Sequence, residues 1–174
     1  LAQVQRGTKE DIDLAVSAAR NAFDNGPWRT MDAVDRGNCL FRLADLVQKH
    51  SNELATIEAI NNGKPAKVAI AADLYLTQSC YRYYGGWADK IKGATLPIEG
   101  NQRFNLYTRK EPVGVVGQII PWNFPILMAA WKLAPAIGAG NCVVLKPAES
   151  TPISILILAE LIADLLPPGV LNIV

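Results

Sequence analysis

The chain has 174 residues, of which 50% are hydrophobic, so it can bury one substantial core and lacks the composition of a disordered or collagen-like protein. It carries 17 Lys and Arg against 16 Asp and Glu, and the resulting net charge of +1 is too small an excess of positive charge to indicate binding to nucleic acid or an anionic membrane. This balance favours a small uncharged or mixed-charge ligand.

The cysteines and the hydropathy pattern bear on where the protein resides. Cys39, Cys80 and Cys142 are far apart and form no CxxC pair, so the sequence predicts neither a disulfide framework nor a zinc site. The most apolar run, residues 125–139, contains a lysine and is shorter than the roughly 20 residues of a membrane-spanning helix. We expect a cytoplasmic protein. Because the chain starts at Leu1 rather than Met, a removed organelle-targeting peptide stays an open alternative.

The first 92 residues are predicted to be mainly helical. Residues 8–11 have the pattern of a capping box, and the helix that follows is expected to end at the turn formed by residues 25–27. Apolar residues recur at helical spacing and are expected to form its buried face: Ile12, Ala15, Val16, Ala19 and Phe23.

Further helices are predicted up to the end of this region. An amphipathic helix is expected to bury Leu40, Leu43, Ala44 and Val47, and to continue over residues 51–60 before the turn at 61–63. One long helix is predicted from Pro65 to about Asp89. Its aromatic residues are interpreted as core rather than as ligand contacts: Tyr81, Tyr83, Tyr84 and Trp87.

Strand-forming patterns replace helical ones after Gly93. Residues 93–111 predict an exposed antiparallel ribbon. In residues 112–174, apolar runs at 113–120, 142–145 and 170–174 alternate with helical patterns at 125–139 and 152–166. This order predicts an α/β fold, the first βαβαβ part of a Rossmann-like parallel sheet, with helices on both faces of the strands.

Ligands of such sheets bind at the carboxyl ends of the strands, so the segment after Ile120 is a candidate site. The motif there is Pro121-Trp122-Asn123-Phe124-Pro125, with two prolines that fix the backbone around the asparagine. The carboxamide of Asn123 could stabilise a negatively charged oxygen in a transition state, or it could cap the following helix. Local chemistry alone favours the capping role.

The segment after the second strand, residues 146–152, places a cation and an anion three residues apart at the same crevice. Lys146 could donate to a ribose hydroxyl or a phosphate, and Glu149 could accept from ribose hydroxyls. A carboxylate here would also repel a 2'-phosphate, which favours NAD over NADP. The equally weighted alternative is a solvated ion pair, with Ser150 or Thr151 capping a helix that Pro152 begins.

Several uncommon motifs, taken together, resemble the aldehyde dehydrogenase superfamily. They occur in the same order and spacing over essentially the whole chain: Asn62-Gly63-Lys64-Pro65, Tyr83-Tyr84-Gly85-Gly86-Trp87-Ala88, Gly117-Gln118-Ile119-Ile120-Pro121-Trp122-Asn123-Phe124-Pro125, Lys146-Pro147-Ala148-Glu149-Ser150-Thr151-Pro152 and Pro167-Pro168-Gly169-Val170-Leu171-Asn172-Ile173-Val174. The chain is therefore similar to the N-terminal part of an NAD-dependent member of this family.

The resemblance implies a role for each part of the candidate site. Asn123 becomes the side-chain donor of the oxyanion hole, in place of the capping role that local chemistry favours. Cofactor contacts are implied for Ile119, Ile120, Pro121, Trp122, Lys146, Ala148 and Glu149. The wall of an aldehyde tunnel is implied for Phe124, Met128 and Trp131, although apolar residues on a buried helix are more often plain core.

The family's chemistry also implies what this chain lacks. A cysteine thiolate attacks the aldehyde to form a thiohemiacetal, hydride passes to the nicotinamide, and a glutamate assists hydrolysis of the thioester. Both residues are expected beyond Val174, in a catalytic domain that is absent here, so we expect the 174-residue chain alone to be inactive. The alternative is a non-catalytic dinucleotide-binding or structural protein. The ribbon at 93–111 resembles the segment through which family members form homodimers or homotetramers.

Overall fold

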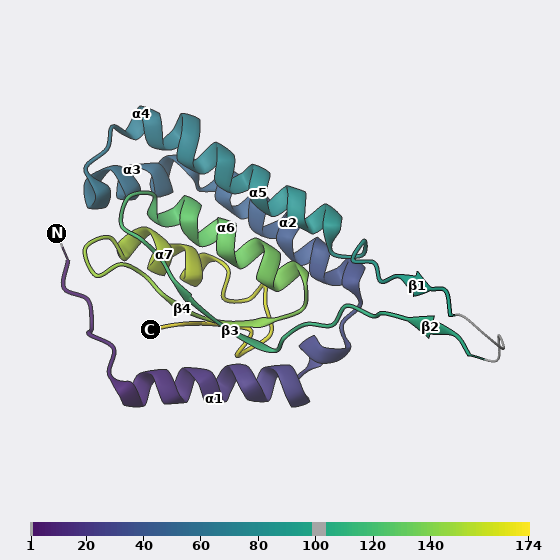
Figure 1. Cartoon of the computed structure of the whole chain (residues 1–174). Coiled ribbons are helices and arrows are strands. Elements are labelled where there is room, and N and C mark those ends of the chain that lie inside the picture. The colour runs from purple at the N-terminus through teal and green to yellow at the C-terminus, as the bar shows by residue number, and fades with distance from the viewer. Residues whose placement is uncertain (1, 99–103) are drawn as a thin grey trace.

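The computed structural model describes residues 2–98 and 104–174, and these residues form stacked layers (Figure 1). Helix α1 (Lys9–Asn25) covers one face of a three-stranded parallel sheet, and helices α6 (Pro125–Gly138) and α7 (Ile153–Leu161) cover the other. Helices α2 (Ala33–Lys49) and α5 (Tyr75–Trp87) pack outside α6. This arrangement confirms the predicted α/β fold class.

Helix α1 begins at the predicted capping box, in which Thr8 and Asp11 each bind the other's backbone amide. Its buried face differs from the prediction, because Ile12 and Val16 are 45% and 42% exposed. Small side chains let the helix backbone approach the sheet closely, and the residues buried there are Ala15, Ala19 and Ala22.

The next helices agree with the sequence pattern. A 3₁₀ turn, η1 (Pro27–Thr30), leads into α2, and His50 separates α2 from α3 (Ser51–Asn62). Gly63 ends α3 with φ of 86°, a left-handed conformation that favours glycine. The predicted apolar stripe of α2 is fully buried: Leu40, Leu43, Ala44 and Val47.

The long helix predicted after Pro65 is continuous but not regular. It consists of α4 (Ala66–Val68), a π-helical segment η2 (Ala69–Leu74) and α5. The aromatic prediction is right for Tyr81, which is buried, and wrong for Tyr83 and Trp87, which are 58% and 49% exposed. These two lie four residues apart on the outward face of α5 and pack on each other, with ring centroids 6.3 Å apart.

The strands follow the predicted order. Strands β1 (Thr95–Leu96) and β2 (Leu106–Tyr107) form an antiparallel ribbon that extends away from the helices (Figure 1). Strands β3 (Val115–Ile119), β4 (Cys142–Lys146) and β5 (Leu171–Ile173) form the parallel sheet in the order β3-β4-β5.

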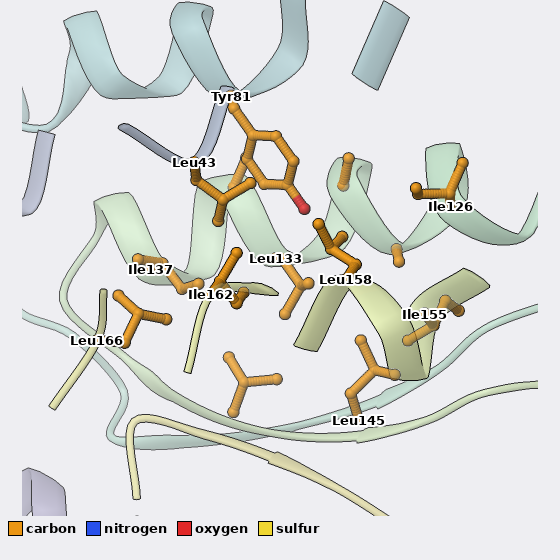
Figure 2. Packing of buried hydrophobic residues seen from close by; sticks show 14 of the residues in the cluster. Leu43, Tyr81, Ile126, Leu133, Ile137, Leu145, Ile155, Leu158, Ile162 and Leu166 are labelled. Carbon is orange, nitrogen blue, oxygen red and sulfur yellow. The ribbon is translucent and has the colours of Figure 1, made fainter. Parts of the chain in front are cut away.

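The core lies between this sheet and the helices above it. Figure 2 shows side chains of α5, α6 and α7, among them Tyr81, Leu133 and Leu158, gathered over Leu145 of β4. The expectation of strands covered on both faces holds for central β4 but fails at the ends of the first apolar run, where Val113 and Ile119 are 81% and 71% exposed. Within residues 2–98 and 104–174, no helix has the length and hydropathy needed to cross a membrane.

Candidate functional site at the carboxyl ends of β3 and β4

The two candidate segments meet at one edge of the sheet. Ile119, the last residue of β3, is the register partner of Lys146, the last residue of β4. The amide of Ile120 extends this pairing and donates to the carbonyl of Lys146 at 2.9 Å. The Asn123 segment and the Lys146–Glu149 segment therefore leave adjacent parallel strands in the same direction.

The capping hypothesis for Asn123 is wrong. The N-cap of α6 is Phe124, whose side chain makes no capping hydrogen bond, and Pro125 is the first helical residue, as predicted. The amide of Ile126 donates instead to Oε1 of Glu58, a buried carboxylate of α3, at 3.4 Å. Asn123 is exposed next to this helix start, so its carboxamide is available for another role.

Lys146 and Glu149 form an ion pair of 3.4 Å on the surface, and the ammonium also donates to the carbonyl of Pro147 at 3.1 Å. A backbone amide and Lys146 lower the pKa of Glu149 below its ordinary range, so this carboxylate is ionised at neutral pH. The pairing matches the predicted alternative of a solvated ion pair. It also places one donor and one acceptor of hydrogen bonds side by side at the strand end.

The predicted cap of the helix after this loop is wrong. The N-cap of α7 is Pro152, and no side chain from Ser150 or Thr151 fills that role. Asn61, at the end of α3 and far away in the sequence, supplies the capping acceptor instead: its Oδ1 accepts from the amide of Ile153 at 3.0 Å. Its Nδ2 also donates to the carbonyl of Ser150 at 3.4 Å.

The next residue of α3 binds the other strand-end loop. Asn62 Nδ2 donates to the carbonyl of Trp122 at 2.7 Å, and Lys64 Nζ donates to the carbonyl of Asn123 at 3.3 Å. The segment of residues 61–64 therefore contacts both loops of the candidate site.

Lys64 is largely enclosed where it makes these contacts. Its side chain is 13% exposed and forms an ion pair with Asp73, whose side chain is fully buried in the π-helical segment. The ammonium also lies 4.4 Å from the centroid of the Phe124 ring, a cation–π distance. The sequence indicated Asn62 and Lys64 only as part of a family motif. It gave no sign of Glu58, Asn61 and Asp73, because their contacts are with residues about 10 to 90 positions away in the chain.

The residues expected to contact the cofactor differ in exposure. Ile119 and Trp122 are 71% and 65% exposed and present apolar surface at the sheet edge. Pro121 and Ala148 are half-buried, whereas Ile120 is buried and only 2% exposed.

The residues expected to form an aldehyde tunnel lie on or beside α6. Phe124 and Trp131 are 42% and 51% exposed, while Met128 is half-buried against the core. Trp131 lines a surface pocket of about 440 Å³ between α5 and α6. Sequence reasoning missed the α5 side of this pocket, although its residues recur at helical spacing: Leu76, Ser79, Cys80, Tyr83 and Tyr84.

The thiols of the chain are poorly suited to nucleophilic attack. Burial raises the pKa of Cys80 and of Cys142 to about 11, and burial also raises the pKa of Cys39 above its ordinary value of 9.0. The protonated thiol therefore predominates at neutral pH, and the thiolate is the reactive form. In the part of the chain that the structure describes, His, Cys, Asp and Glu form no group of three or more able to hold a metal ion.

Known proteins of one family resemble this chain in both sequence and structure. Residues 1–174 match the profile of the aldehyde dehydrogenase family. The chain is 56% identical over 176 residues to the mitochondrial aldehyde dehydrogenase of Homo sapiens and 55% identical over 176 residues to aldehyde dehydrogenase 1A1 of the same species. These alignments cover 100% of this chain but only 34% and 35% of the relatives, so the chain spans about a third of their length.

Solved structures have the same fold. The NAD+ complex of an aldehyde dehydrogenase from Bacillus cereus superimposes with a TM-score of 0.94 at 50% identity, over 97% of this chain and 34% of that one. An aldehyde dehydrogenase from Burkholderia cenocepacia, described as putative, superimposes with a TM-score of 0.95 at 44% identity, over 100% of this chain and 35% of that one.

Proposed function

Because the chain belongs to the aldehyde dehydrogenase family, we propose that it forms the cofactor-binding front part of an enzyme that oxidises an aldehyde to a carboxylic acid with NAD. The observation that carries this proposal is the pairing of Ile119 with Lys146, which brings the Asn123 loop and the Glu149 loop to one sheet edge. Nucleotides bind at that edge in open α/β sheets.

The residues at this edge fit NAD chemically. Lys146 would donate to a ribose hydroxyl and Glu149 would accept from one, while the exposed Ile119 and Trp122 offer apolar surface to a flat ring. The ionised Glu149 would repel the 2'-phosphate of NADP, which favours NAD. When bound, NAD supplies the hydride acceptor of the reaction.

Asn123 is the proposed catalytic residue of this chain. Its carboxamide is a neutral donor beside a proline-bounded turn, and it would donate to the aldehyde oxygen as negative charge develops there. The proposal places Phe124, Met128 and Trp131 in the wall that contacts the rest of the aldehyde. The exposure of Phe124 and Trp131 supports this role.

The nucleophile is proposed to come from another part of a longer polypeptide. The three thiols described above have raised pKa values, and a general base to hydrolyse a thioester is likewise not assigned to any residue of this chain. We therefore expect the longer enzyme to carry out the oxidation and the 174-residue chain alone to lack it.

A spectrophotometric assay tests this proposal. The purified 174-residue chain and a polypeptide of full family length that contains it are each mixed with NAD and acetaldehyde, and NADH is followed at 340 nm. NADH formation by the longer protein alone supports the proposal. NADH formation by the 174-residue chain contradicts the proposal that the nucleophile lies elsewhere in a longer polypeptide. If the longer protein binds NAD without turnover, the result favours a non-catalytic dinucleotide-binding protein.

Assembly through the β1–β2 ribbon is also part of the proposal. The ribbon exposes apolar side chains, with Phe104 and Tyr107 at 77% and 70% exposure, and such surface is typical of protein contacts. We expect a homodimer or homotetramer of the longer enzyme, and replacing both residues with Ser should shift its mass in light scattering toward the monomer. A cytoplasmic location stays a prediction, since relatives with mitochondrial names are as similar as aldehyde dehydrogenase 1A1.

A further inference from the structure

The segment of residues 61–64 and its buried ion pair have no role in the chemistry proposed above. Among the described residues, Lys64 Nζ contacts the carboxylate of Asp73, the carbonyl of Asn123 at 3.3 Å and the ring of Phe124 at 4.4 Å. The side-chain amide of Asn62 donates from Nδ2 to the adjacent carbonyl of Trp122 at 2.7 Å. Two consecutive carbonyls of the Asn123 loop are thus held by side chains of one distant segment.

We propose that Lys64 and Asn62 are positioning residues, which hold the backbone of Trp122 and Asn123 so that the Asn123 carboxamide points toward the substrate oxygen. This inference rests on the proposed role of Asn123 and adds the residues that orient it. Neither side chain is assigned a contact with substrate or cofactor.

Burial and charge explain why Lys64 can act as a rigid anchor. The Lys64 side chain is 13% exposed and Asp73 is fully buried, so solvent screens the attraction between the two charges only weakly. Asp73 lies in the π-helical segment η2, whose backbone is held by its packing on α3. A lysine held in this way fixes the position of the Asn123 carbonyl relative to η2 and α3.

The consequence for catalysis follows from geometry. An oxyanion donor acts only when it lies within hydrogen-bond distance of the position where the charge develops. Displacement by about 1 Å of a group that positions the reacting atoms can reduce the rate by about a hundredfold. Loss of the Lys64 contact should therefore reduce the rate of attack on the aldehyde without removing any catalytic group.

The test is a double-mutant cycle in the full-length enzyme, with kcat/KM for the aldehyde measured at saturating NAD. Lys64→Met should lower kcat/KM by about tenfold or more when Asn123 is present. In the Asn123→Ala background the same change should have little effect, because there is no longer a carboxamide to orient. A merely structural role would instead give equal losses in both backgrounds.

Matched variants complete the experiment. Lys64→Arg should restore most of the rate, because a guanidinium can bind both Asp73 and the Asn123 carbonyl. Lys67→Met, on the exposed lysine of α4, should leave kcat/KM unchanged. Asn62→Ala tests the Trp122 contact without leaving a buried charge, and so keeps the inference falsifiable if Lys64→Met does not fold.

Each result has one meaning. A loss in Asn123→Ala with wild-type rates in Lys64→Met and Asn62→Ala overturns this inference and leaves the proposed role of Asn123 intact. Equal losses in both backgrounds also overturn it. Unchanged kcat/KM in Asn123→Ala contradicts the role of Asn123 itself, and the inference fails with it.

Discussion

The carboxylate of Glu58 accepts a hydrogen bond from the amide of Ile126 at 3.4 Å, and this contact joins α3 to the start of α6. Glu58 is fully buried and its Oε2 has no hydrogen-bond partner among the described residues. Burial raises the pKa of Glu58 above its ordinary value of 4.5, and this effect is partly offset by Ser154, the Ile126 amide and the charge of Lys64. The first turn of α6, which follows Asn123, is therefore hydrogen-bonded to a titratable carboxyl group.

Glu58→Gln should make the enzyme more stable at neutral pH. A raised folded-state pKa means that the folded protein binds a proton more tightly than the unfolded chain, so stability falls as the pH rises from 4.5 through that pKa. Glutamine keeps the acceptor for Ile126 and never ionises. The melting temperature of the variant relative to wild type should rise between pH 4.5 and 7.

Asn123→Ala in the full-length enzyme should lower turnover by about a hundredfold or more, because the aldehyde oxygen loses a preorganised donor. Single-turnover NADH formation measures the affected step. Asn38→Ala, on an exposed position of α2, is the control and should match wild type. A wild-type rate in Asn123→Ala would leave the side chain without a catalytic function.

Glu149→Gln should weaken NAD binding by about tenfold and reduce discrimination against NADP, because the variant loses both a charged acceptor and the repulsion of a 2'-phosphate. Titration of the full-length enzyme with NADH and NADPH, followed by nucleotide fluorescence, measures both constants. Glu160→Gln, an exposed carboxylate of α7, controls for net charge. Identical constants in Glu149→Gln and wild type would remove Glu149 from the cofactor site.

Gly169→Ala should destabilise the protein by roughly 1–3 kcal/mol, because the residue has φ of 83° and an added Cβ would lie 2.7 Å from the carbonyl oxygen of Ala18. The affected contact is the one between α1 and the approach to β5. Gly86→Ala in α5 is the matched control, since an added Cβ there meets nothing within 4 Å and alanine favours the helix. Urea denaturation should therefore give midpoints that move in opposite directions.

Local sequence patterns predicted most of the fold because their signals are carried by neighbouring residues. The capping box at Thr8, the buried stripe of α2 and the alternation of strands and helices after residue 112 all depend on spacing along a few turns or one strand. The patterns failed where the burial of a side chain depends on which other element packs against its helix. Spacing could not show that alanines, rather than Ile12 and Val16, face the sheet, or that Tyr83 and Trp87 face outward.

The sequence by itself determined the family, the parallel sheet and the segments that end its strands, because these follow from local periodicity and from motifs in a fixed order. Only the tertiary structure decided how the strand-end loops are held. Asn61, Asn62 and Lys64 bind backbone carbonyls and amides 59 to 92 residues away, and backbone groups carry no side-chain signature that could mark them as partners in a sequence.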